Sequence, residues 1–157
     1  MVTTAEETVQ LTSDRWQSVS PSVACANRSR KIPADGDSFA VRRSPWEWQL
    51  AQLMPILAQA NVSADVRQAA VWIVTDDASF EDLGSLVVSS WGGPGAGRTR
   101  AINVYDAACA MKICDEAGIG ITYKAIWNDR DTIISQLKFL EANWAECKQL
   151  RQWLEQK

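Results

Sequence analysis

The stretch SADVRQAAVWIVTDD, residues Ser63 to Asp77, decides how the rest of the chain is interpreted. Its apolar side chains leave almost no polar face, so it predicts a helix that is buried on most sides. Ser63 is placed to cap the first turn by accepting a hydrogen bond from an unpaired backbone N–H. Gln68 interrupts the apolar run, and a buried carboxamide is unfavourable unless it is hydrogen-bonded or used covalently. A functional hypothesis therefore has to explain Gln68.

The composition excludes several classes of function. With 157 residues, the chain is expected to form a single domain over 1–157, with residues 1–12 frayed. A net charge of −3 argues against a nucleic-acid binder, because phosphate contacts require a surplus of Lys and Arg. The absence of histidine removes the usual general base near neutral pH and the commonest metal ligand. No cofactor is expected.

The four cysteines include no CxxC pair, so we expect no metal site and mostly free thiols packed in the core. No stretch is apolar and long enough to suggest a membrane span. The first ten residues also lack the positive end and the apolar core of a signal peptide.

The N-terminal part predicts a small antiparallel sheet. Residues Trp16 to Asn27 alternate apolar and polar side chains, which places Val23 and Cys25 on the inward face of a strand. Ser38 to Val41 alternates again and is expected to supply a second strand. The basic residues of the intervening loop, Arg28 among them, are interpreted as solvated side chains.

Two capping boxes predict the next helices. Ser44 to Glu47 carries a proline at the first helical position and predicts a helix that runs towards Asn61, with a kink at Pro55. Ser79 to Asp82 predicts the start of a short helix after the central one. A brief strand is expected at Leu86 to Val88.

The C-terminal third predicts two further helices. Ala101 to Ala117 is amphipathic and is followed by Gly118, a C-cap residue. Ile119 to Ala125 alternates and predicts a short strand, after which Asp129 is expected to cap one long final helix. The apolar seam of that helix is Ile133, Leu137, Leu140, Trp144, Cys147, Leu150 and Leu154.

The predicted fold is therefore α+β and mainly α, with a small N-terminal antiparallel sheet packed on a helical bundle. The final helix either packs on the protein's own core or binds a partner helix, including that of a second copy. The glycine-rich loop Gly92–Thr99 offers a minor alternative, nucleotide binding, because G-x-x-x-x-G-R-T differs from a P-loop by Arg98 in place of lysine.

Cys25 and Gln68 together suggest a family. The strand segment S-V-A-C-A-N, the loop P-A-D-G and the helix Q-A-A-V-W-I-V-T-D resemble the internal-thioester domains of Gram-positive surface adhesins, over about residues 16–77. In that family a strand cysteine and the glutamine of a Q-x-A-[IV]-W helix are joined side chain to side chain. Cys25 matches the cysteine, and Gln68, Ala70, Val71 and Trp72 match the glutamine motif.

The resemblance implies an adhesion-type binding module on the cell surface, whose Cys25–Gln68 thioester acylates an amine on a protein partner. At most it implies single-turnover attachment rather than an enzyme. The alternative is a non-enzymatic helical interaction or scaffold domain, which would fit a cytoplasmic protein. In that case Cys25 fills space in the core, and Gln68 hydrogen-bonds loop backbone where the helix meets the sheet.

Overall fold

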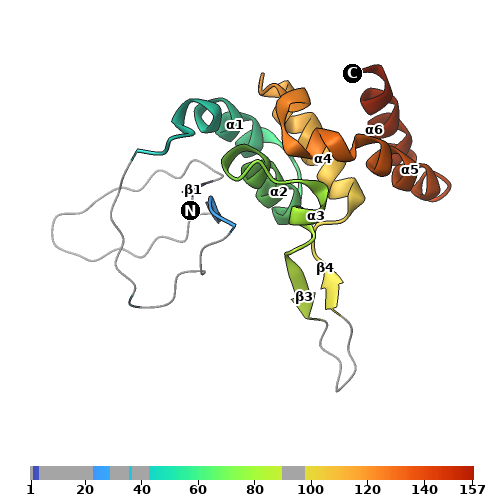
Figure 1. The fold of residues 1–157 in the computed structure, drawn as a ribbon, viewed down its shortest axis with the longest axis horizontal. Helices are drawn as coiled ribbons and strands as arrows, with labels where there is room; N and C mark the ends of the chain where they lie inside the picture. The colour runs from blue at the N-terminus through green and yellow to red at the C-terminus, as the bar shows by residue number, and fades with distance from the viewer. Residues whose placement is uncertain (1, 4–22, 29–35, 37–42, 90–97) are drawn as a thin grey trace.

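The computed structural model describes residues 2–3, 23–28, 36, 43–89 and 98–157, and this part of the chain is mainly α-helical (Figure 1). Its helices are α1 (Glu47–Gln59), α2 (Ala64–Thr75), α3 (Phe80–Leu83), α4 (Val104–Glu116), α5 (Arg130–Leu140) and α6 (Ala145–Gln156). Two short 3₁₀ helices, η1 (Ile121–Tyr123) and η2 (Ala125–Asp129), join α4 to α5.

The predicted central helix is confirmed as α2, which packs between α1 and α4 (Figure 1). Ser63 caps it as predicted, because its hydroxyl accepts a hydrogen bond from the N–H of Val66 at 3.2 Å. Its buried residues are Val66, Ala69, Ala70, Val71, Trp72, Ile73 and Val74. A helix that is apolar on most sides can lose water from nearly all of its surface only in the centre of a bundle.

The predicted capping box at Ser44 is wrong. Trp46 occupies the N-cap position of α1 without a side-chain hydrogen bond, while the Ser44 hydroxyl accepts from the N–H of Trp46 at 3.1 Å. The serine therefore closes a turn before the helix instead of capping the helix itself. α1 ends at Gln59 and runs without a break through Pro55, whose side chain is exposed.

α4 begins and ends on residues that fix its limits. Asn103 forms a capping box with Asp106, a signal that the sequence prediction missed. At the other end Gly118 has a φ of +74°, and the N–H groups of Gly118 and Ile119 bond to the carbonyls of Asp115 and Cys114 at 2.9 and 3.0 Å. These two bonds form a Schellman motif, so the prediction of a C-cap at Gly118 is confirmed.

The predicted N-terminal sheet is not found in the described residues. Residues 16–22 and 38–41, which carried most of that prediction, lie outside them. What is described is a two-residue antiparallel ladder between β1 (Val2–Thr3) and β2 (Val23–Ala24). Residues 1–12 were expected to be frayed, but Val2 and Thr3 are paired in this ladder. The predicted parity is also wrong, since Ala24 is 3% exposed and Val23 is 47% exposed.

A second antiparallel ladder joins β3 (Val87–Ser89) to β4 (Arg98–Arg100), and it projects away from the helices (Figure 1). β3 matches the strand expected at Leu86–Val88 to within one residue. The strand expected over Ile119–Ala125 is wrong. Ile119 and Ile121 are buried as alternation required, but the chain enters the 3₁₀ helix η1 at Ile121, and Tyr123, the next residue of the alternation, is 91% exposed.

The single long C-terminal helix is also wrong, because the chain turns between Leu140 and Ala145 and α6 packs back against α5. The turn is supported by Arg151 of α6, which pairs with Glu141 in the turn and with Glu155. Buried seam residues from both helices face the protein's own core: Ile133, Leu137, Cys147, Leu150 and Leu154. These five seam residues are therefore covered within the chain, while Trp144 in the turn is 49% exposed.

Candidate functional site

The side chain of Gln68 lies against the main chain of Cys25, although the two residues are 43 positions apart. The N–H of Cys25 donates to Oε1 of Gln68 at 2.8 Å, and Nε2 of Gln68 donates to the carbonyl oxygen of Cys25 at 2.8 Å. Both polar ends of the carboxamide are thus satisfied by one residue. The structure therefore brings together the two site residues that the sequence predicted, but the contact joins the Gln68 side chain to the main chain of Cys25.

The Cys25 side chain is half-buried, and its thiol donates to the carbonyl oxygen of Asn27 at 3.1 Å. Cys25 follows β2 directly, and the N–H and C=O of an extended residue point to the same side of the backbone. Gln68 therefore occupies the position that a neighbouring strand would take. The side chains of a strand stand out of the plane of its backbone hydrogen bonds, so the Cys25 thiol points out of the plane of the two hydrogen bonds to Gln68.

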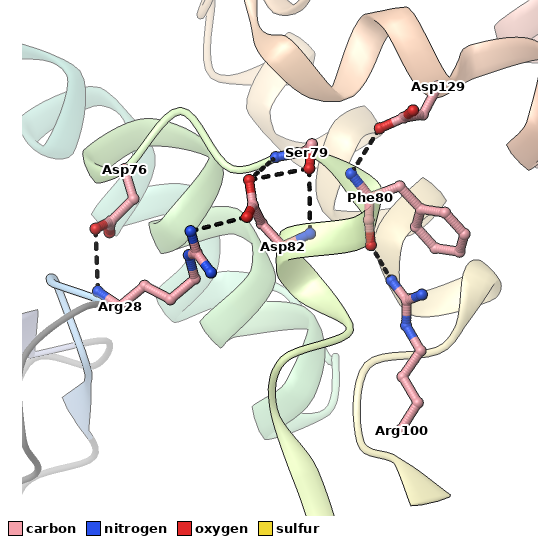
Figure 2. Close-up of polar contacts among 7 residues, drawn as sticks. All are labelled: Arg28, Asp76, Ser79, Phe80, Asp82, Arg100 and Asp129. Carbon is pink, nitrogen blue, oxygen red and sulfur yellow. Dashed lines mark hydrogen bonds and ion pairs between the residues drawn. The ribbon is translucent and has the colours of Figure 1, made fainter.

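A second anchor holds the segment after Cys25 on α2 and α3 (Figure 2). The backbone N–H of Arg28 donates to Asp76 Oδ1 at 3.0 Å, just beyond the end of α2. The Arg28 guanidinium then pairs with Asp82 of α3 at 2.8 Å. Residues 25 to 28 are consequently fixed at both ends, which sets the position of Cys25 relative to Gln68.

Asp82 also completes the predicted capping box of α3, which is confirmed (Figure 2). Its Oδ2 accepts from the N–H of Ser79 at 3.0 Å and from the Ser79 hydroxyl at 2.9 Å. The backbone hydrogen bond from Ser79 is the main cause that lowers the pKa of Asp82, and Arg28 lowers it further. The ionised carboxylate that pairs with Arg28 is thereby favoured.

The sequence predicted that Asp129 caps the helix that follows it, and this prediction is wrong. Its carboxylate accepts instead from the N–H of Phe80, the first residue of α3, at 2.8 Å (Figure 2). Arg100 approaches the same turn, with its guanidinium 3.9 Å from the centre of the Phe80 ring and bonded to the Phe80 carbonyl. The α3 turn beside Asp82 is therefore held from two distant parts of the chain.

The sequence prediction missed Arg28, Asp76 and Asp82 as parts of this site. Arg28 belongs to a run of basic loop residues, and such runs are usually solvated. The available signal was the capping box, because a carboxylate already oriented by Ser79 is a ready partner for a nearby guanidinium.

Trp72, one helical turn after Gln68, is buried against the core, and its indole N–H has no hydrogen-bond partner within the described residues.

All four cysteines are free. Burial raises the pKa of Cys109 and Cys147, and raises that of Cys114 to about 12, so these three thiols are poorly suited to react as thiolates.

The glycine-rich loop gives a different arrangement from a P-loop. Residues 92–97 lie outside the described residues, while Arg98 and Thr99 lie in β4, paired with β3. The next helix begins only at Val104. In a P-loop the corresponding residues open the helix that follows the loop, where backbone N–H groups face the phosphates.

Within the described residues, no group of three acidic or cysteine side chains is placed to hold a metal ion. None of the helices in that part of the chain is long and apolar enough to cross a membrane.

Comparison of the chain with protein-family models, with curated proteins and with solved structures finds no match.

Proposed function

We propose that this domain is a binding module that attaches covalently to an amine on a protein partner through an internal thioester between Cys25 and Gln68. One observation carries the proposal: the Gln68 carboxamide is held by two 2.8 Å hydrogen bonds against the residue whose thiol would attack it. Such placement replaces a bimolecular encounter by an intramolecular one, which contributes a large part of the rate of reactions of this kind.

The first step is an acyl transfer within the chain. The Cys25 sulfur attacks the side-chain carbonyl carbon of Gln68, a C–S bond forms, and the C–N bond to Nε2 breaks. Ammonia leaves with the thiol proton. The N–H of Cys25 already donates to Oε1, and negative charge develops on this oxygen as the carbon becomes tetrahedral. A main-chain donor aimed at a developing oxyanion favours the transition state.

The attack requires one change in the arrangement described here. The Cys25 thiol must leave the carbonyl of Asn27 by rotation about χ1. The proposal requires that this rotation bring the sulfur over the face of the carboxamide, out of the plane of the Cys25–Gln68 hydrogen bonds. A nucleophile adds to a trigonal carbon from that direction.

In the second step, an amine of the partner attacks the thioester, forms an amide with the Gln68 acyl group and releases the Cys25 thiol. The acyl group is useful only if it survives hydrolysis until the amine arrives, which requires protection from water. The half-buried positions of Cys25 and Gln68, and the anchoring of Arg28 beside them, support this requirement. The proposal agrees with the resemblance to adhesin thioester domains and with a location at the cell surface.

The test is the intact mass of the freshly prepared, non-reduced protein. A thioester makes the chain one ammonia lighter than its sequence, and methylamine then adds at Gln68. Cys25→Ala should restore the full mass and abolish methylamine labelling. Cys109→Ala is the matched control, since Cys109 is another half-buried free thiol and its removal should leave both results unchanged.

The second candidate is a noncovalent helical scaffold, in which Gln68 serves only to hold β2 on α2. The same pair of hydrogen bonds favours it, because together they satisfy the carboxamide without any chemistry. This candidate predicts the full, unmodified mass, a titratable Cys25 thiol and no methylamine labelling. Those three results together would refute the thioester.

A further inference from the structure

A cleft of about 440 Å³ opens beyond the C-terminal end of α2. It lies between the start of α1, the second residue after the end of α2 and the segment that follows α4. Its walls include Trp46, Trp48, Asp77, Tyr123 and Lys124. No step of the thioester proposal uses any of these residues.

Gln49 lines the cleft from α1 and is only 8% exposed. Within the described residues its Oε1 is buried and has no hydrogen-bond partner. A buried acceptor left unpaired destabilises the fold, so an occupant that donates a hydrogen bond there would relieve the penalty. The terminal torsion of a glutamine is soft, and its rotation would present the carboxamide to such an occupant.

The aromatic side chains of the cleft are unusually open for their size. Trp48 is 61% exposed and Tyr123 is 91% exposed. The Tyr123 ring lies over Gly120, where a Cβ would come within 2.9 Å of it. Exposed, positioned rings of this kind provide flat apolar contact surface at little cost in side-chain entropy.

Charge in the cleft is balanced and fixed in place. Asp77 adopts a φ of +49°, and its carboxylate accepts from the N–H of Ala125 at 3.0 Å. The Lys124 ammonium donates to the carbonyl of Val74 at 3.3 Å and lies 5.2 Å from the centre of the Trp46 ring. The protein's own cation thus faces Trp46, which disfavours a cationic ligand, while Asp77 disfavours an anionic one.

From these features we infer that the cleft binds a neutral saccharide. A sugar ring presents an apolar C–H face that can stack on Trp48 and Tyr123. Its hydroxyls both donate and accept, so they can pair with Gln49, with Asp77 and with Lys124. Pockets that combine apolar walls with a few fixed polar groups are the usual form of small-molecule sites. This inference does not depend on the thioester.

The test follows the indole N–H signals of the full chain by two-dimensional NMR during titration with cellotetraose, chitotetraose and maltotetraose. At least one sugar should shift the Trp46 and Trp48 signals. Trp48→Ala should weaken binding at least about tenfold, the loss typical of an aromatic anchor. Gly120→Ala should weaken it as well by displacing Tyr123. Phe139→Ala is the matched control, because Phe139 is an exposed ring on α5 that does not line the cleft.

Three results would overturn the inference. The first is the absence of any shift with all three sugars at about 10 mM, which is about ten times a dissociation constant of about 1 mM. The second is binding that survives Trp48→Ala, which would place the sugar elsewhere. The third is a proline-rich peptide that shifts the same signals when the sugars do not, which would make the cleft a peptide groove. Unchanged shift dispersion of the other indole signals in each variant shows that the fold is kept.

Discussion

The contact between Gln68 and Cys25 can be measured apart from any thioester chemistry. Both hydrogen bonds use main-chain groups of residue 25, so Cys25→Ala removes the thiol and keeps both bonds. In that background, Gln68→Met keeps the length of the side chain and removes its donor and its acceptor. Two net hydrogen bonds of about 0.5–1.5 kcal/mol each give an expected loss of about 1–3 kcal/mol.

The assay is hydrogen exchange at the amide of residue 25, whose N–H donates to Gln68. A loss of about 1–3 kcal/mol should speed its exchange about five- to 150-fold, if the segment opens locally. Gln49→Met is the matched control, because it makes the same replacement on α1 at a glutamine whose Oε1 has no partner in the described residues. Exchange at residue 25 that is equal in the Gln68→Met and Gln49→Met proteins would refute the docking of Gln68 on Cys25.

Gln68→Glu in the same background reproduces the product of thioester hydrolysis. The introduced carboxylate can still accept from the N–H of residue 25, but its second oxygen faces a carbonyl where Nε2 donated. Its pKa should rise in the folded state, because only the protonated form can donate there. The stabilising contact is then present below the ordinary pKa of about 4.3 and is lost as pH rises through the raised value. Urea unfolding at acidic and neutral pH measures this, and equal destabilisation at both would contradict it.

Four further predictions follow from the fold. Trp72→Ala should destabilise the protein by about 3–5 kcal/mol in urea unfolding, and a loss below about 1 kcal/mol would show α2 to be peripheral. Truncation after Asn128 should unfold the domain, because the seam it removes is buried; a folded truncated protein by circular dichroism would contradict this. Cys114 alone should lower the stability between about pH 9 and 12 by up to about 1.4 kcal/mol per pH unit, because its thiol ionises more readily in the unfolded chain than in the folded one, and Cys114→Ala should remove that part of the slope. Asp82→Ala should cost about 1 kcal/mol more than Arg28→Gln, because it removes the capping-box acceptor as well as the ion pair, whereas Arg28→Gln removes only a partly exposed ion pair; equal losses would show that the cap contributes little.

The parts of the fold that the sequence predicted are those with a local cause. α2 follows from a run of apolar residues that only a central helix can bury. Its start follows from Ser63, whose hydroxyl accepts from the N–H three residues later in the chain. Gly118 and the Ser79 capping box are equally local. Each is decided by residues within one or two turns of each other.

The errors arise where the same pattern fits two structures. The seam from Ile133 to Leu154 has the same spacing whether the helix continues or folds back, and no glycine or proline marks the turn before α6. Ile119 and Ile121 have the spacing of a strand and both are buried, yet the chain continues from Ile121 as a 3₁₀ helix. Asp129 has the position of an N-cap, but α3 lies close enough to take its carboxylate. Tertiary contacts decide these cases.

The candidate site shows the same division between local pattern and tertiary contact. The motif around Gln68 identified both residues, but the expected route was an inward-facing thiol, and the strand has the opposite parity at Val23 and Ala24. The pair meets because Gln68 bonds to backbone, which every residue presents whichever way its side chain points. Since the N–H and C=O of Cys25 both face Gln68, the carboxamide is oriented before any chemistry begins. A covalent site and a structural dock can therefore both start from this arrangement, and the fate of the Cys25 thiol distinguishes them.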